Sequence, residues 1–282
     1  MSLFTFEEFM KYIQDHILEE LPKEWEDAKM ILQPVVKPGR TYQGLTVCPK
    51  EELGGAIIDL DLLYECYKQG TAMPQIIEQA ACIAMTPIPV SILDWGEYDR
   101  LKDRLCIRLI RKEGNEEYLT GVPYREVLDM IEVCCVLSIA EDGQVLGATL
   151  TDSFLRQNHV TEDQLFEDAL ENAQKILPAQ IAPLGAGPFL YVTNDHHIHG
   201  ASAILYPGVL EEAAEELGGD FYLLPSSVHE VILVKADDNC SAEGLTELIR
   251  DINCAMVAEK DQLSDHPYYY DAALGRLERM ES

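Results

Sequence analysis

The residues best suited to chemistry gather in one stretch, residues 189–234, which holds four of the seven histidines. Within it, Asp195, His196, His197 and His199 offer carboxylate and imidazole groups. Imidazole in particular is a good ligand for zinc, nickel and copper. The alternative interpretation is an exposed polar turn, because a hairpin tip rarely supplies the supporting contacts that orient metal ligands. We therefore predict no bound metal and no cofactor.

A second group of polar residues lies within residues 225–230. Ser227 and His229 are two residues apart and would face the same side of a strand, as a nucleophile and its base could. His229 and Glu230 could instead act as an acid–base pair. Neighbours on one strand lack a third group and an oxyanion hole, so the alternative is a turn whose hydroxyls bond the backbone. We assign no catalytic residue, and the candidate functional surface comprises Asn194, Tyr206, Ser226, Ser227, His229 and Glu230.

The position of His229 follows from the expected pairing of strands. Asn194 lies just after the apolar run 189–192, which could pair beside residues 228–234. We therefore expect His229 to lie near Asn194 or Tyr206, in a shallow depression at one sheet edge.

Several strings of the chain are similar to an uncharacterised bacterial family. They are LYVTN, GASAILYP, LGGDFYLLPSSVHEVI and, upstream, IDLDLLYECYKQG. The segment TLTDSFLRQNHVTEDQLFEDALENAQKI also resembles a second uncharacterised bacterial family. The resemblance implies no particular activity, and His196, His197 and His199 depart from its pattern. The positions that match it are Thr193, Asn194, Gly200, Tyr206, Pro207, Pro225, Ser226, Ser227, His229 and Glu230.

The chain is strongly acidic, with 21 Lys and Arg against 50 Asp and Glu and a formal charge of −29. Such a surface repels phosphate, so we predict no direct binding of nucleic acid. The charge favours solubility, and the alternative is a surface that captures a basic partner or mimics nucleic acid. No apolar run approaches the roughly 20 residues of a membrane span. The N-terminal MSLFTFEEFMKYIQ is acidic and amphipathic, unlike a signal peptide, and we expect a cytoplasmic protein.

The eight cysteines are predicted to be free thiols of structural importance, as in a reducing compartment. No pair has the C-x2-C spacing of a zinc or redox site. Cys134 and Cys135 would face opposite sides of a strand and cannot bind one metal. The consecutive tyrosines 268–270 either anchor a partner or pack the C-terminal tail onto the body.

Hydrophobic periodicity predicts an α+β fold with largely antiparallel sheets, built from hairpin-then-helix units. A regular β-α-β alternation is missing, which argues against a doubly wound sheet. Helices are predicted at 5–21, 59–67, 74–85, 94–103, 154–157, 162–177, 209–217 and 242–256. Pro207 suits the first turn of the helix at 209–217. Strands are predicted at 30–36, 41–47, 105–110, 131–140, 145–151, 189–192, 201–205, 221–224 and 228–234.

The proline-rich string TPIPVS separates a predicted N-terminal part, residues 1–88, from residues 89–282, although the chain could also form one domain. The sequence lacks a P-loop, a dinucleotide-binding loop, H-E-x-x-H and G-x-S-x-G. We therefore expect a non-catalytic binding or interaction module that recognises a protein or a small molecule. The alternative is a hydrolase or metal-assisted enzyme that uses His229 and Glu230, or the cluster from His196 to His199.

Overall fold

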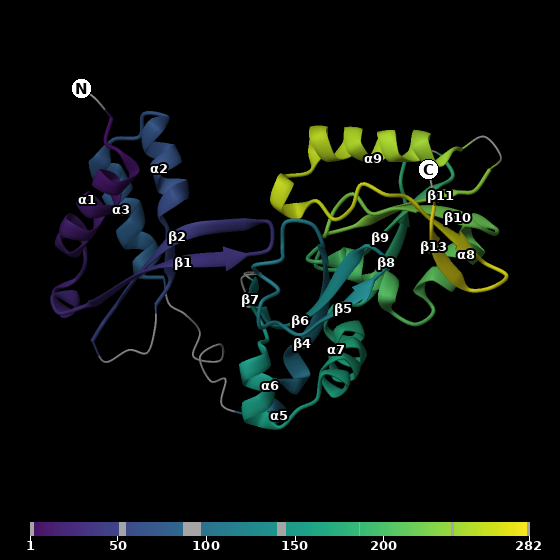
Figure 1. Ribbon diagram of the computed structural model, residues 1–282, viewed down its shortest axis with the longest axis horizontal. Helices are drawn as coiled ribbons and strands as arrows, with labels where there is room; N and C mark the ends of the chain where they lie inside the picture. The colour runs from purple at the N-terminus through teal and green to yellow at the C-terminus, as the bar shows by residue number, and fades with distance from the viewer. Residues whose placement is uncertain are drawn as a thin grey trace. The chain divides into compact units, whose positions relative to one another are not determined.

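The computed structural model describes residues 3–50, 55–86, 97–139, 145–185, 187–237 and 240–280. The chain divides into two compact units, Met1–Leu93 and Asp94–Ser282, and each is described by itself. Both combine helices with antiparallel sheets, which confirms the α+β class (Figure 1). No helix among these described ranges is long and apolar enough to cross a membrane.

The first unit packs helices onto a three-stranded antiparallel sheet. Its elements are α1 (Phe6–His16), η1 (Ile17–Glu20), η2 (Lys23–Trp25), β1 (Lys29–Lys37), β2 (Arg40–Cys48), β3 (Ile57–Asp59), α2 (Leu60–Lys68) and α3 (Met73–Ala84), where η denotes a 3-10 helix. The sheet order is β1-β2-β3. Leu45, Val47 and Ile58 on its strands are fully buried in one core cluster with Phe9 and Ile13 of α1. The predicted hairpin of residues 30–36 and 41–47 is therefore present.

Local signals account for the elements of this unit. Thr5 and Glu8 form a capping box at the start of α1, which satisfies two free backbone donors. Asp59 caps α2 by accepting the Leu62 amide, and its carboxylate also pairs with Arg40 at 2.8 Å. Gly39 has a positive φ of 70°, which suits the tight turn between β1 and β2.

The second unit contains a six-stranded antiparallel sheet with the order β13-β12-β10-β11-β9-β8. Its strands are β8 (Ala179–Pro183), β9 (Phe189–Asn194), β10 (Phe221–Leu224), β11 (Val231–Lys235), β12 (Tyr268–Asp271) and β13 (Arg276–Arg279). Strand β9 pairs with β11 so that Val192 lies opposite Val231. This pairing is the one on which the expected position of His229 depends.

A four-stranded sheet of the same unit is organised around its longest strand. Its strands are β4 (Leu105–Arg111), β5 (Tyr124–Val127), β6 (Met130–Ile139) and β7 (Val145–Thr149). Strand β6 pairs with each of the other three. In the register of β4 and β6, Cys106 lies opposite Cys135 and Arg111 lies opposite Met130. Cys134 and Cys135 are adjacent on one strand, as predicted.

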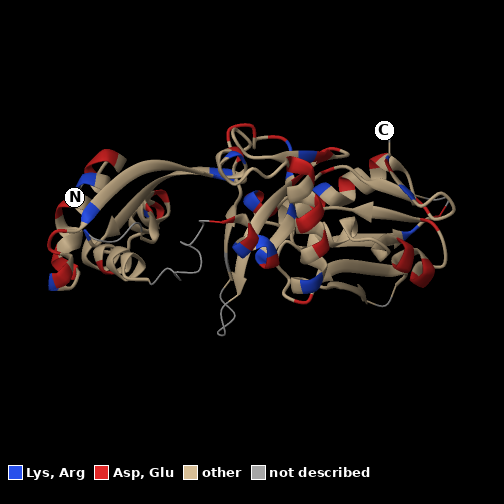
Figure 2. Cartoon of the chain, turned by 90° about the horizontal axis from the view of Figure 1, so that it is seen from below, with Lys and Arg blue, Asp and Glu red and all other residues tan. Residues whose placement is uncertain are grey.

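Helices cover the sheets of the second unit (Figure 1). They are α5 (Tyr98–Leu101), η3 (Lys102–Arg104), α6 (Asp152–Asn158), α7 (Glu162–Ile176), η4 (Gly200–Leu205), α8 (Val209–Leu217), α9 (Ala242–Met256) and η5 (Glu259–Asp261). Leu245 and Ile249 of α9 pack on Tyr222 and Leu224 of the six-stranded sheet. The Asn172 amide of α7 donates to the Leu105 carbonyl at 2.9 Å, which holds that helix against β4. The acidic residues are spread along the sequence of both units (Figure 2).

Some predictions of secondary structure were wrong. Residues 201–205 lie in the 3-10 helix η4 and not in a strand. A short, largely apolar run has no periodicity that separates helix from strand. Residues 179–183, predicted as a loop, form β8, and β5 was not predicted. Pro207 lies outside α8, whose N-cap is Gly208. The predicted boundary at 88/89, part of the predicted helix 94–103, residue 140 of the predicted strand 131–140 and the turn 141–144 lie outside the described residues.

Candidate functional site

Asn194 ends β9 and organises the histidine turn that follows. Its side-chain amide donates to the Ile198 carbonyl at 2.7 Å, and its carbonyl oxygen accepts the amides of His196 and Ile198. Asn194 is completely buried, so this side chain holds the turn in place. Within the described ranges, no cluster of three or more His, Cys, Asp or Glu side chains is placed to hold a metal ion.

The predicted residues Tyr206, Ser226 and Ser227 are also buried. Burial raises the pKa of the Tyr206 phenol, whose oxygen has no hydrogen-bond partner within the described residues. The Ser227 hydroxyl accepts the backbone amide of His229 at 3.0 Å, as a serine in a turn does. Ser227 is thus engaged with the backbone of His229 instead of its ring. The functional importance of these residues stays a prediction.

His229 is half-buried, with Glu230 exposed beside it. Its Nδ1 accepts the His199 amide at 3.4 Å, so the neutral ring carries its proton on Nε2. That Nε2 lies 3.6 Å from the Asp261 carboxylate. Burial lowers the pKa of His229 and outweighs the opposing effect of Asp261. Both ring nitrogens therefore face partners within the chain, which weakens the case for His229 as a general base.

His229 lies near the end of β9, as expected. Its carbonyl accepts the Thr193 hydroxyl at 2.8 Å, one residue from Asn194. Gly200 fits between them, because a Cβ at this position would lie 2.2 Å from Thr193 Oγ1 and 2.3 Å from the His229 carbonyl oxygen. Only glycine allows this close approach of the two backbones.

A segment that sequence reasoning did not select, residues 261–266, runs beside residues 225–230. The backbone amide of Val228 donates to the Asp261 carbonyl at 2.8 Å, and the amide of Ser264 donates to the Pro225 carbonyl at 3.0 Å. Ser227 and Gln262 form an isolated antiparallel bridge between them. We call residues 225–230 and 261–266 the paired segments.

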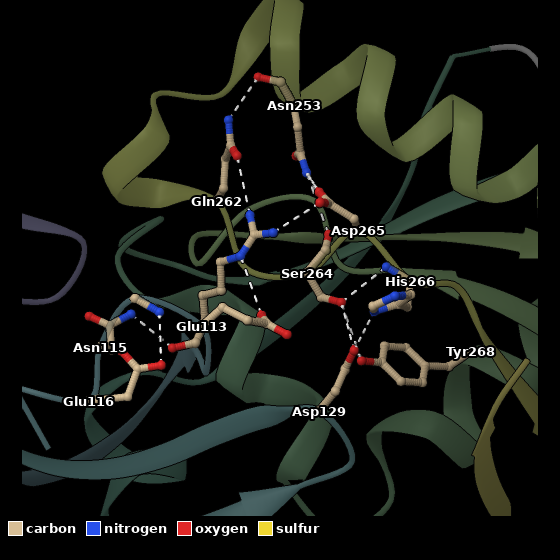
Figure 3. Close-up of polar contacts among 12 residues, drawn as sticks. Glu113, Asn115, Glu116, Asp129, Asn253, Gln262, Ser264, Asp265, His266 and Tyr268 are labelled. Carbon is tan, nitrogen blue, oxygen red and sulfur yellow. Dashed lines mark hydrogen bonds and ion pairs between the residues drawn. The ribbon is translucent and has the colours of Figure 1, made fainter.

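The paired segments bring His266 to the carboxylate of Asp129, in the turn just before β6 (Figure 3). His266 Nδ1 lies 2.5 Å from Asp129 Oδ2, and the Ser264 hydroxyl donates to the same oxygen at 3.3 Å. The Tyr268 hydroxyl donates to Ser264 Oγ at 3.5 Å. The carboxylate thus orients the His266 ring, whose Nε2 has no partner within the described part of the chain.

Arg111, at the end of β4, connects the same segment to its surroundings. Its guanidinium contacts Asp265 at 2.9 Å, Gln262 at 3.4 Å and Glu113 at 3.5 Å. Asn253 of α9 donates to the second oxygen of Asp265 at 2.7 Å. Burial alone would raise the pKa of Asp265, but the hydrogen bonds from Asn253 and Arg111 outweigh it and the pKa is lowered. These contacts tie the 261–266 segment to β4 and α9.

Comparison with known protein families gives one match, to a family described as "Family of unknown function (DUF5688)", over residues 6–187 and 186–272. The chain belongs to this family. The match extends through both units, so this DUF5688 protein carries the family pattern in each of them. No curated protein and no solved structure matches the chain.

Sequence reasoning missed Arg111, Asp129 and the 261–266 segment of this DUF5688 protein. Arg111 and Asp129 lie more than a hundred residues before His266, and only the folded chain places them together. The local signal was the polar string DQLSDH between α9 and the tyrosines. Polar strings of this kind are common in loops, so the signal is weak without the register of the strands.

Proposed function

We propose that this DUF5688 protein is a non-catalytic binding module, and that the paired segments form its docking surface for a positively charged region of a partner protein. The observation that supports the proposal is the arrangement of part-buried carboxylates on and beside these segments. Asp261, Asp265 and Asp129 each contact a cationic or imidazole group of the same chain. A partner would therefore meet a surface that is already ordered, which lowers the entropy cost of binding.

The charge of the paired segments favours a basic partner. Glu230 is exposed on the paired segments, and Glu113 is exposed beside them. Arg111 is already paired with two carboxylates. A cationic partner would also be attracted by the formal charge of −29 on the whole chain. Asn194, Tyr206, Ser226 and Ser227 are buried, so they would contribute to this surface as structural support. A cytoplasmic location remains part of the proposal.

Affinity capture with charge-reversed variants tests this function. We expect Glu230→Lys to reduce the recovery of partner proteins from a native extract, because it inverts the charge at the docking surface. Glu215→Lys on the exposed face of α8 makes the same change away from the paired segments and is the matched control. Equal recovery with both variants and the unchanged protein would contradict the assignment of the surface.

A second candidate function, acid–base catalysis, is favoured by the orientation of His266. A carboxylate on Nδ1 leaves Nε2 available as a proton acceptor, an arrangement that hydrolases use. Its side chain is 31% exposed, so a substrate could reach it. The nearby Ser264 hydroxyl instead donates to Asp129 and is buried, so it is not placed as a nucleophile.

A panel of chromogenic esters and amides separates the two functions. A hydrolase would turn over at least one substrate, and His266→Gln would abolish that turnover while the melting temperature stays close to that of the unchanged protein. We expect no turnover above the buffer rate with either protein. Turnover that depends on His266 would replace the binding proposal with the catalytic one.

A further inference from the structure

The four-stranded sheet contains a pair of thiols that the proposed docking surface does not use. Cys106 of β4 and Cys135 of β6 are direct antiparallel partners, and their sulfur atoms lie 3.1 Å apart. The two residues are 0% and 3% exposed. Opposed residues of an antiparallel pair have Cα atoms about 4.5–5.5 Å apart, which lies inside the range of about 4.4–6.8 Å that a disulfide spans. The backbone therefore already has the spacing that a disulfide needs.

Polar groups without partners surround the two thiols. The hydroxyl of Tyr206 and the Nε of Arg108 are buried and have no hydrogen-bond partner within the described residues, and the imidazole of His199 interacts with the Cys135 thiol. Tyr206 is 3% exposed. Buried polar atoms without a partner are rare in native cores, so each of them calls for an explanation. His199 and Arg108 act electrostatically on the pKa of the thiol pair, and the thiol pair acts on the pKa of Tyr206.

Cys135 differs from its neighbour Cys134 in chemistry although both are buried. The Cys106 thiol and the His199 imidazole lower the pKa of Cys135 against the effect of burial. Burial raises the pKa of Cys134, which faces the other side of β6. A thiolate is the reactive form of cysteine, so the environment activates Cys135 and leaves Cys134 inert.

We propose that Cys106 and Cys135 are a peroxide-reactive dithiol that closes to a disulfide, with His199 as the group that accepts the proton of Cys135. The Cys135 sulfur attacks one oxygen of hydrogen peroxide, the O–O bond breaks, and the leaving hydroxide takes the proton from His199 to give water. Cys106 sulfur then attacks the sulfenic acid on Cys135, the S–O bond breaks, and a second water leaves with the Cys106 proton. The dithiol loses two electrons and the peroxide gains them.

The low exposure of the pair decides which oxidant it accepts. A small, uncharged peroxide can reach a buried sulfur during local opening of the sheet, whereas a bulky disulfide such as oxidised glutathione is excluded by the surrounding side chains. Cys82 and Cys254 are exposed, so the size of the oxidant does not restrict their oxidation. Neither of them has a second thiol opposite it among the described residues. Disulfide formation is therefore specific to Cys106 and Cys135.

Peptide mapping of the full chain tests the proposal. Native protein is treated with N-ethylmaleimide to block exposed thiols, exposed to hydrogen peroxide, quenched in acid and digested. Trypsin releases Leu105–Arg108, in which Cys106 is the sole thiol, so a bridge to it appears as a linked peptide. The variant Cys134→Ser removes the adjacent thiol and is expected to keep the bridge. Absence of the bridge in both proteins, or its loss in Cys134→Ser alone, would overturn the proposal.

The contribution of His199 is tested by rate. His199→Asn keeps a residue that tolerates the left-handed backbone at this position, where φ is 51°. We expect bridging at neutral pH to slow by at least about tenfold, because fewer thiolates form without the proton acceptor. The rate of the variant should then rise with pH toward the ordinary thiol pKa of about 8.5. A rate and pH profile unchanged from the parent would show that His199 is not the acceptor.

Discussion

At the residue scale, His229 and Gly200 show how closely the backbone of the candidate site is fitted. His229 uses its ring and its carbonyl to hold the histidine turn, through the His199 amide and the Thr193 hydroxyl. Gly200 lies where these backbones meet and has no room for a side chain. The roles of these residues in shaping the surface can therefore be measured as changes in stability.

Stability near neutral pH should depend on His229. The pKa of His229 is lowered in the folded protein. As the pH falls, His229 of the unfolded chain therefore binds its proton first, near the unfolded pKa of about 6.5. The stability that the neutral ring contributes is thus present above that pH and is lost as the pH falls toward the folded pKa. We expect His229→Gln to flatten the fall of the unfolding free energy between neutral and mildly acid pH, in urea titrations. An unaltered pH dependence would show that the ring does not carry this effect.

Gly200→Ala should destabilise the second unit by about 1–3 kcal/mol, the usual cost of forcing atoms into a packed site. The added Cβ would clash with Thr193 Oγ1 and with the His229 carbonyl. Gly244→Ala in α9 is the matched control, because a Cβ there meets Ser241 Oγ at an ordinary 3.4 Å. We expect the control to be neutral or slightly stabilising in urea unfolding, since alanine favours a helix. A loss of stability in the control as large as in Gly200→Ala would contradict the explanation.

At the scale of elements, the sequence predicted the helices and strands whose local signals agree with their tertiary environment. The capped helices α7 and α9, and the hairpin of β1 and β2, have clear periodicity and turn residues. The apolar run 201–205 has none, and it forms a 3-10 helix whose Ser202 hydroxyl donates to the Ile107 carbonyl across the core. The 261–266 segment could not be selected because its partners come from β4 and from the loop before β6. Long-range register, which the sequence does not encode locally, decides that part of the site.

Asp265 should contribute to the acid stability of the paired segments. Its pKa is lowered in the folded state, so its stabilising effect is present above the unfolded value of about 3.9 and is lost as the pH falls through the folded pKa. We expect Asp265→Asn to lower the unfolding free energy at pH 7 and to reduce the loss of stability below about pH 4. Asp251→Asn on the exposed face of α9 removes the same charge and serves as control. Identical pH profiles for the two variants would contradict the contribution of Asp265.

At the scale of the whole molecule, the chain has separate cores in its two units. The core of the first unit gathers α1, α2, α3 and the three-stranded sheet, and the clusters of the second unit contain none of those residues. The docking surface and the thiol pair belong to the second unit alone. We therefore expect the first unit to open without loss of either site.

Ile13→Ala tests this separation. Ile13 is fully buried in the first unit, and loss of its side chain should destabilise that unit by about 2–5 kcal/mol. Hydrogen exchange should accelerate in peptides of residues 3–86 and stay unchanged in residues 97–280. Acceleration of equal size in both ranges would show that the two units unfold as one.

The central claim, that the paired segments bind a partner, is tested most directly by a hydrogen-exchange footprint. The protein is labelled free and in complex with the partner recovered by affinity capture, and protection is compared peptide by peptide. The account predicts new protection in residues 225–230 and 261–266 together, and its loss when the complex is formed with Glu230→Lys at matched concentration. Protection confined to other residues, with these two segments exchanging at the same rate in both states, would contradict it.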